Sequence, residues 1–398
     1  MQYDAIIIGT GQAGPALAAR LSAAGMRVAI VERGAIGGTC VNTGCIPTKT
    51  LVASAAAAET VRRASRFGVS AGGPVSVDMK AVKARKDAIA GQSRSGVESM
   101  LRGLTNGTLH TGHARLESAR TVRVGDEVLE ADRIFLNVGG RAITGTIRGV
   151  ADVPFWTNSS MMTVDFVPPH LIIVGGSYVG LEFAQMYRRF GSAVTVVEMA
   201  KRLVAREDED VSAAIREILE AEGVAVRTGA KCIAAEKGPS GIRVDTDCRE
   251  GSPAIDGTHL LLAVGRRPNT DDLGLDRAGV QVDERGYVKV DDQLRTSVPG
   301  IWALGDCNGR GAFTHTAYND YEIVAANLLD GETRRVTDRI DAYALYVDPP
   351  LGRAGMGENQ PVSNDQIQNA LGSEQVKALA AKMGIDPAQA SSFLAEYM

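Results

Sequence analysis

The sequence has few cysteines and no long hydrophobic run, and each of these two features argues against one class of protein. Its 398 residues include five cysteines, a small and odd number that argues against a secreted disulfide framework and favours a reducing cytoplasm. No apolar stretch approaches the roughly 18 residues that a transmembrane helix needs, and no basic leader precedes the first strand-like residues. A net charge of −4 without a basic block gives no support for nucleic-acid binding. We therefore expect a cytoplasmic protein.

Glycine, in contrast, is abundant. Many of the 45 glycines fall at turns between apolar runs and helical segments, which is typical of an α/β protein. Hydrophobic residues make up 44% and charged residues 23% of the chain, as in ordinary globular proteins. The length predicts two or three domains.

An internal duplication predicts the architecture. Each copy runs through a strand, a glycine-rich turn, a helix and a second strand, and the copies are offset by 166 residues. The first copy begins with Ile6–Gly14 and ends with Val28–Glu32, whereas the second begins with Ile172–Gly180 and ends with Val194–Glu198. Two units of this kind predict an α/β fold with two Rossmann-like dinucleotide-binding domains.

The glycines of the first copy have separate tasks. Gly9 makes the tight turn, Gly11 lets the backbone approach a pyrophosphate, and Gly14 lets helix and strand pack closely. The pyrophosphate would lie over the helix N-terminus, where unpaired N–H groups favour negative charge. Glu32, which lies 23 residues after Gly9, would hold the adenosine ribose. The matching residues of the second copy are Gly175, Ser177, Gly180 and Glu198, with a serine where glycine is usual.

Two dinucleotide sites in one chain predict FAD together with a nicotinamide nucleotide. Glu198 favours NADH, because a carboxylate would repel the 2′-phosphate of NADPH. Lys201 and Arg202 follow closely and could accept that phosphate, so NADPH stays as the alternative. Occupation of only one of the two units also stays open.

A cysteine pair follows the first unit. Cys40 and Cys45 lie within Gly37–Lys49, where a four-residue gap in a helix-initiating segment would let the two sulfurs meet. This is not the spacing typical of zinc ligands, and no second Cys or His pair lies nearby, so no metal site is predicted. A close pair in a reducing compartment favours redox catalysis over two unrelated buried thiols. The other cysteines, Cys232, Cys248 and Cys307, lack such a setting.

Together these motifs resemble the class I pyridine nucleotide–disulfide oxidoreductases, which include dihydrolipoyl dehydrogenase, glutathione reductase and mercuric reductase. The resemblance covers residues 1 to about 357 and extends to Ile134–Gly140, Leu262–Asn269 and Gly300–Asp306. It implies that electrons pass from NAD(P)H through FAD to a Cys40–Cys45 disulfide. The final acceptor would be a small-molecule disulfide, a protein disulfide or a metal ion.

The resemblance also implies roles for single residues. Cys45 is the sulfur nearest the flavin, and Cys40 exchanges with the acceptor. Lys49 should lie near the flavin, pair with Glu182 and favour the reduced, anionic ring. Tyr178 would cover the flavin until the nicotinamide displaces it. Further cofactor contacts are expected from Gly38, Thr39, Gly139, Gly265, Gly305, Asp306 and His315, the last in a segment that opens a helix.

The C-terminal part departs from that family. The family's His-Pro-Thr-x-x-Glu segment, whose histidine serves as a base across the dimer interface, is absent. The five histidines are His110, His113, His170, His259 and His315. We therefore expect flavin reduction with impaired disulfide turnover, and a homodimer like that of the family is doubtful here.

These observations predict a domain plan. A discontinuous FAD-binding domain would span 1–147 and 270–340, with an NAD(P)-binding domain at 148–269 inserted. Residues 341–357 would begin a truncated dimerisation domain, and 358–398 would form a helical tail that resembles the end of YidB-like proteins. Two other functions stay open. One is a truncated or chimeric flavoprotein that serves as a binding module, and the other is an NADH oxidase or diaphorase that does not use the cysteines.

Overall fold

The computed structural model describes residues 1–70, 72–247 and 254–358. The helical tail predicted at 358–398 therefore lies outside the described residues except for its first position, and so does Cys248. Every described helix and strand belongs to the unit Met1–Ala354. None of the helices in the described ranges combines the length and the hydropathy that crossing a bilayer requires.

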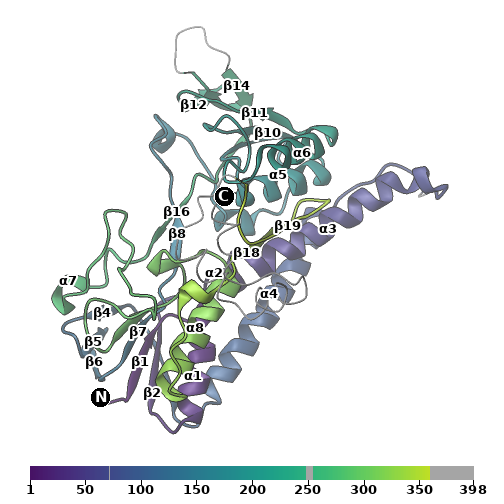
Figure 1. Ribbon diagram of the computed structural model, residues 1–398. Coiled ribbons are helices and arrows are strands. Elements are labelled where there is room, and N and C mark those ends of the chain that lie inside the picture. Colours follow the sequence, from purple (N-terminus) through teal and green to yellow (C-terminus); the bar gives the residue numbers. More distant parts are fainter. Residues whose placement is uncertain (71, 248–253, 359–398) are drawn as a thin grey trace, which may run out of the picture. The chain divides into compact units, whose positions relative to one another are not determined.

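A five-stranded parallel sheet forms the centre of the first nucleotide-binding unit (Figure 1). Its strands are hydrogen-bonded in the order β17 (Ile301–Ala303), β7 (Ile134–Leu136), β1 (Ala5–Ile8), β2 (Val28–Glu32) and β3 (Gly107–Thr111). The run Ala-Ile-Ile-Ile of β1 is buried along its whole length, as expected for a parallel strand covered on both faces.

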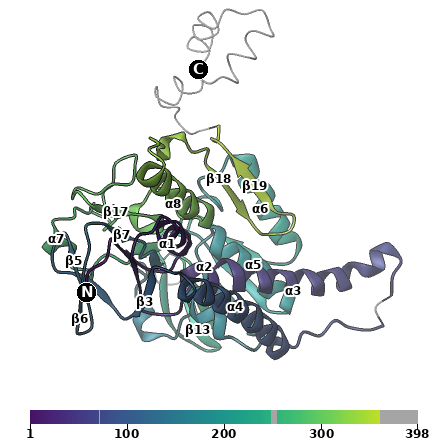
Figure 2. The same cartoon turned by 90° about the horizontal axis from the view of Figure 1, so that it is seen from below.

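Successive side chains of β1 enter different cores, because a strand alternates its faces. Ile7 packs with α1 (Ala13–Ala23) and α8 (Thr314–Leu329), which lie side by side in both views (Figures 1 and 2). Ile6 and Ile8 instead pack against a three-stranded antiparallel sheet. That sheet consists of β4 (Ala114–Leu116), β5 (Thr121–Val124) and β6 (Glu127–Glu130).

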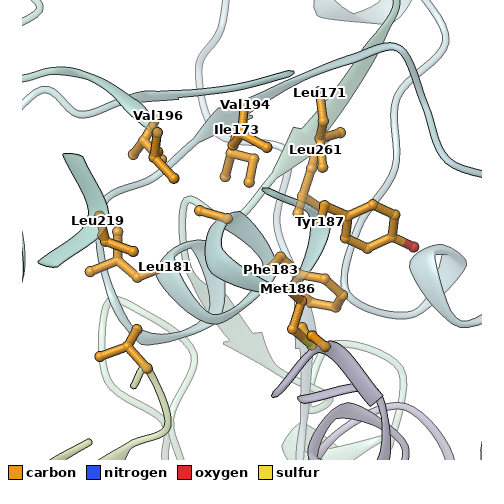
Figure 3. Close-up of a cluster of buried hydrophobic side chains, with 14 of the residues drawn as sticks. Leu171, Ile173, Leu181, Phe183, Met186, Tyr187, Val194, Val196, Leu219 and Leu261 are labelled. Carbon is orange, nitrogen blue, oxygen red and sulfur yellow. The ribbon is translucent and has the colours of Figure 1, made fainter. Parts of the chain in front are cut away.

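The second unit repeats this plan. Its parallel sheet has the order β11 (Ala225–Arg227), β10 (Ala193–Val197), β9 (His170–Val174) and β15 (His259–Leu262). One face packs on α5 (Tyr178–Phe190) and α6 (Glu209–Ala221), and Figure 3 shows Leu181, Phe183 and Met186 of α5 beneath Ile173 and Val194 of the strands. The other face packs on an antiparallel sheet of β12 (Ala234–Gly238), β13 (Gly241–Asp245) and β14 (Ala254–Gly257). The predicted fold class, with two Rossmann-like units, is confirmed.

The two glycine-rich turns are built alike at the level of single hydrogen bonds. Gly9 N donates to Val31 O and Gly175 N donates to Val197 O, both at 2.8 Å. A Cβ on Gly9 would lie 2.2 Å from the Asn137 carbonyl oxygen, and one on Gly175 would lie 2.3 Å from that of Ala263. Both glycines also have positive φ, so neither turn accepts a side chain at this position.

The two units are joined by a pair of antiparallel strands, β8 (Gly140–Ala142) and β16 (Arg266–Pro268). A separate hairpin of β18 (Ala342–Leu345) and β19 (Leu351–Ala354) follows α8 (Figure 2). The remaining helices are α2 (Gly38–Asn42), α3 (Cys45–Arg63), α4 (Met79–Arg102) and α7 (Leu275–Ala278), with 3₁₀ turns at Ala64–Phe67, Val150–Asp152, Ser160–Thr163, Gly305–Asn308 and Val336–Asp338.

The hairpin is tied to the second unit by backbone as well as side-chain contacts. Tyr346 N donates to Glu182 Oε1 at 3.0 Å, and Asp348 N donates to Gln185 Oε1 at 2.8 Å. The Asp348 carboxylate also pairs with Arg189 of α5 at 2.8 Å. The hairpin β18–β19 therefore closes one side of the site described below.

Candidate active site

A cavity of about 770 Å³ brings most of the predicted flavin-site residues together. It is lined by the turn before α1, by α2 and the start of α3, by α5, by the start of α8 and by the hairpin β18–β19. The predicted site residues in its wall are Gly11, Thr39, Cys40, Cys45, Lys49, Gly139, Tyr178, Glu182, Gly305, Asp306 and His315. Gly9, Gly14, Glu32, Gly38 and Gly265 do not line this cavity, nor do Gly175, Ser177, Gly180 and Glu198 of the second turn.

The glycines outside the wall still shape it. A Cβ on Gly14 would lie 2.4 Å from the Gly9 carbonyl oxygen, because α1 packs directly against the turn. A Cβ on Gly38 would lie 2.8 Å from the Gly11 Cα atom, so α2 also approaches the turn at backbone distance. These contacts leave the Gly11 backbone exposed to the cavity at the N-terminus of α1, where an anion is stabilised.

Two glutamates occupy equivalent positions in the two units. The Glu32 carboxylate accepts from Thr10 N at 3.0 Å and from Gly34 N at 2.9 Å. The Glu198 carboxylate accepts from Gly176 N at 2.6 Å and from Ala200 N at 2.7 Å. Each carboxylate is therefore fixed at the end of the second strand of its unit, where an adenosine ribose would lie.

The cysteine pair lies where two helices begin. Cys40 belongs to the short α2, and Cys45 is the first residue of the 19-residue α3. Both thiols are free, and they are hydrogen-bonded to each other. The bond from Cys40, a second bond from Thr314 and the charge of Lys49 lower the pKa of Cys45 to about 6. The same bond and burial raise the pKa of Cys40, which favours Cys45 as the thiolate of the pair and Cys40 as the protonated partner.

Lys49 and Glu182 form an ion pair beside these thiols, as the resemblance implied. Glu182 is 7% exposed, and its second carboxylate oxygen accepts from Tyr346 N. The Lys49 ammonium also lies 4.2 Å from the centre of the Tyr346 ring. The lysine is therefore held in the cavity wall by an anion and an aromatic face, with its charge one helical turn from Cys45.

Several residues of the wall were not singled out from the sequence. Asn137 Nδ2 donates to the carbonyl oxygens of Gly9 and Gly11 at 3.3 and 3.1 Å, and so it holds the glycine turn in place. Arg266 donates to Gly140 O and lies 3.7 Å from Asp306, a carboxyl whose pKa is raised by burial. Both residues belong to segments that carry the resemblance, but only the folded chain shows their partners.

The other predicted residues have simpler surroundings. His315 is exposed, stacks on Phe313 and bonds through Nε2 to Ala342 O. Cys307 is buried and free, whereas Cys232 is disulfide-bonded, although no sequence motif predicted a bond there. Across residues 1–70, 72–247 and 254–358, no cluster of three or more His, Cys, Asp or Glu side chains is arranged to hold a metal ion.

Comparison with known proteins places this geometry in context. The sequence profile described as pyridine nucleotide-disulphide oxidoreductase matches residues 3–320. Mercuric reductase from Streptomyces lividans is 36% identical and is matched over 90% of this chain and 76% of its own length. Dihydrolipoyl dehydrogenase from Thermus scotoductus is 34% identical, over 90% of this chain and 77% of its own.

Solved structures of disulfide reductases are also similar to this chain. The HOCl-induced flavoprotein disulfide reductase RclA from Escherichia coli superposes with a TM-score of 0.82 at 34% identity, covering 90% of this chain and 78% of that chain. A Cu(II) complex of the same reductase superposes with a TM-score of 0.80.

Proposed function

The chain belongs to the pyridine nucleotide–disulphide oxidoreductase family, and from this premise we propose that it passes electrons from NADH, by way of FAD, to the Cys40–Cys45 pair. The observation that carries the proposal is the position of this pair. Both cysteines line one cavity together with the glycine turn that would receive a pyrophosphate and with the half-buried Asp306. A thiol pair with one low pKa in the wall of a dinucleotide-sized cavity is suited to two-electron chemistry.

The residues present fit FAD. The cavity volume of about 770 Å³ is typical of a cofactor site, and it lies against the N-terminus of α1. Gly11 would approach the pyrophosphate, Glu32 would hold the adenosine ribose, and Asp306 would accept from the ribityl hydroxyls. Lys49 would place positive charge beside the isoalloxazine ring. The flavin, when bound, supplies hydride acceptance from a nicotinamide and two-electron transfer to a disulfide.

We propose NADH as the electron donor. The Glu198 carboxylate is fixed by two backbone N–H groups at the position where the ribose 2′-hydroxyl would lie, and it would repel a 2′-phosphate. Arg202, which could have offered a phosphate site, instead pairs with Glu209 at 2.7 Å and donates to Glu207 O. Because Arg202 is already paired, it is less available to bind the 2′-phosphate of NADPH, and this favours NADH.

The chain's own thiols would do the work of the first half-reaction. When the Cys40–Cys45 disulfide takes up two electrons, one proton is enough to give a Cys40 thiol and a Cys45 thiolate. Thr314 and Lys49 stabilise that thiolate, as the lowered pKa of Cys45 indicates. Cys40 then has to lose its proton before it can attack an acceptor, because the thiolate is the nucleophile.

We propose that this second half-reaction is slow. The pKa of Cys40 is raised, so little of it is thiolate near neutral pH. His315 is the histidine in the cavity wall among the described residues, and its Nε2 atom is engaged with Ala342 O. A general base is typically worth about 10² to 10⁴ in rate, and the cavity wall, as far as the structure describes it, offers no second imidazole as a base for Cys40.

The acceptor would be a disulfide or a soft metal ion. Thiolates are preferred ligands of soft metals, and two similar proteins are a mercuric reductase and a reductase solved with Cu(II). Either acceptor would be bound at Cys40, the cysteine that keeps its proton while Cys45 is the thiolate.

Anaerobic titration of the flavin-loaded protein tests the function. One equivalent of NADH should produce a long-wavelength absorbance from a thiolate beside oxidised flavin, and NADPH should need a much higher concentration. Simple bleaching of the flavin by the first equivalent would indicate an NADH oxidase or diaphorase that does not use the cysteines. Nucleotide binding without any absorbance change would indicate a binding module.

The same absorbance band should titrate with the pKa of Cys45. Because this pKa is lowered to about 6, the band should be present above pH 6 and be lost as the pH falls through that value. Lys49→Gln should move the midpoint upward, because it removes a cation that favours the thiolate. A midpoint near 8.5, the value of an unperturbed thiol, would contradict this assignment.

A further inference from the structure

Glu207 is a buried carboxylate that binds three side chains from separate parts of the fold. It is 1% exposed. Its Oε1 atom accepts from the Tyr178 hydroxyl at 3.1 Å and also from the Tyr343 hydroxyl. Its Oε2 atom accepts from Arg353 Nη1 at 2.8 Å. Tyr178 begins α5, whereas Tyr343 and Arg353 belong to β18 and β19, so this one carboxylate joins the second unit to the hairpin.

The backbone before Glu207 is strained. Val204 has a φ of 40°, which is costly for a β-branched residue. Val204 N donates to Gly176 O at 2.8 Å, and Glu207 N donates to Val204 O at 2.7 Å. The strained residue is therefore hydrogen-bonded to the glycine-rich turn through its N–H group and to the backbone of Glu207 through its carbonyl oxygen. These two hydrogen bonds hold it in that conformation.

The partners of Glu207 line the flavin cavity, but Glu207 itself does not. The Tyr178 and Tyr343 rings meet edge to face at 5.4 Å, and Tyr343 stacks on Phe313 at 5.5 Å. The ring of Tyr178 is thus part of the cavity wall while its hydroxyl is bonded to a carboxylate behind that wall. A nicotinamide that displaced the Tyr178 ring from the wall would have to break this hydrogen bond.

We infer that Glu207 is a latch for the Tyr178 side chain, and that Tyr343 and Arg353 set its strength. The inference rests on the proposed function, since it concerns how the nicotinamide reaches the flavin. When Tyr178 moves away, Glu207 keeps the Tyr343 hydroxyl and Arg353 as donors. The buried carboxylate therefore stays paired, and the heavy cost of an orphaned charge is avoided. Glu207 is a positioning residue that acts through Tyr178.

The hairpin is anchored firmly enough to serve as the fixed part of this latch. Asp348, in the turn between β18 and β19, bonds to Gln185 and pairs with Arg189 of α5. Arg353 also pairs with Asp208 at 3.2 Å. Tyr343 and Arg353 consequently stay in place while Tyr178 moves. The relative strengths of the hydrogen bonds from Tyr178 and Tyr343 to Glu207 then decide how often the Tyr178 ring leaves the cavity wall.

Two conservative variants should shift nucleotide affinity in opposite directions. Tyr178→Phe removes the bond that holds the ring in the wall, so NAD⁺ should bind about fivefold more tightly to the flavin-loaded protein. Tyr343→Phe leaves Glu207 more dependent on Tyr178, so NAD⁺ should bind about threefold more weakly. The double variant should match Tyr178→Phe alone, because no Tyr178 bond is left to strengthen. Tyr318→Phe, on the exposed face of α8, is the matched control and should change nothing.

Calorimetric NAD⁺ titrations give the affinities, and fluorine NMR of protein labelled with 3-fluorotyrosine gives a readout that needs neither flavin nor nucleotide. The Tyr178 signal should shift in Tyr343→Phe and in Glu207→Gln but not in Tyr318→Phe. Affinity shifts of the same sign in both single variants, or an unchanged Tyr178 signal, would overturn the latch. A wild-type protein that NADH never reduces, but whose Tyr178 signal responds as expected, would overturn the proposed function and leave the latch standing.

Discussion

Replacing Cys45 by serine should reduce disulfide turnover by about 10³-fold or more while NADH still reduces the flavin, because the variant loses the covalent relay but keeps the nucleotide turns. Cys45 is the group whose lowered pKa marks it as the thiolate, and a hydrogen bond from Cys40, a hydrogen bond from Thr314 and the charge of Lys49 all favour that thiolate. The long-wavelength absorbance should disappear with it. Stopped-flow reduction by NADH and steady-state assays with a disulfide acceptor measure the two half-reactions separately.

Cys40→Ser provides the matched comparison. It should also lose disulfide turnover, but Cys45 would remain as a thiolate beside oxidised flavin, so the absorbance band should be present before any reductant is added. Cys307→Ser controls for the loss of a thiol as such, because Cys307 is fully buried and bonds to the carbonyl oxygens of Leu136 and Leu304. Disulfide turnover by Cys45→Ser at the wild-type rate would show that the pair is not the relay.

Gly14→Ala should purify without flavin, with the affinity for FAD lowered by about 10²-fold or more. The new Cβ would lie 2.4 Å from the Gly9 carbonyl oxygen and 2.7 Å from Asn137 Nδ2, and the first of these is backbone that cannot turn aside. Either α1 or the turn has to move, and the surface that receives the pyrophosphate moves with it. Absorbance of the purified protein and reconstitution with added FAD measure the effect.

The internal repeat supplies the control for that experiment. Gly180 is the counterpart of Gly14, and its Cβ would lie 2.0 Å from the Gly175 carbonyl oxygen. Gly180→Ala should therefore keep its flavin but lose reduction by NADH. Gly96→Ala, inside α4 with no atom beyond the adjacent backbone of that helix within 4 Å of the new Cβ, should keep both and gain about 0.5–1 kcal/mol of helix stability. Full flavin content in a folded Gly14→Ala, checked by circular dichroism, would contradict the assigned role of the turn.

The sequence predicts those parts of the molecule that depend on local pattern. The strands β1, β2, β9 and β10 and the turns between them follow from apolar runs and glycine spacing, because each strand–turn–helix–strand copy consists of residues close together in the chain. The Lys49–Glu182 pair is a different case. It joins residues 133 positions apart, and it was expected only through the resemblance to a family.

Other contacts cannot be recognised from the local pattern of the sequence. Tyr178, Glu207 and Tyr343 meet at one point, although 165 residues separate the two tyrosines and nothing in their surroundings repeats. The bond from Thr314 to Cys45 joins the start of α8 to the start of α3 in the same way. The antiparallel sheet of β4, β5 and β6 was missed for another reason, since strands of three or four residues with mixed burial carry too little periodicity to be recognised.

The order of strands in the first sheet has a consequence for how the protein is made. The edge strand β17 and the covering helix α8 are encoded after the whole of the second sheet, so the ribosome releases them after it. The second unit is continuous in the chain and can fold as it emerges, because domains generally fold as units during synthesis. Until β17 and α8 emerge, the first unit has one edge of β7 unpaired and the face of β1 under α1 only partly covered. The wall of the cavity that would hold FAD is therefore completed only after α8 has been made, when the second unit has already emerged.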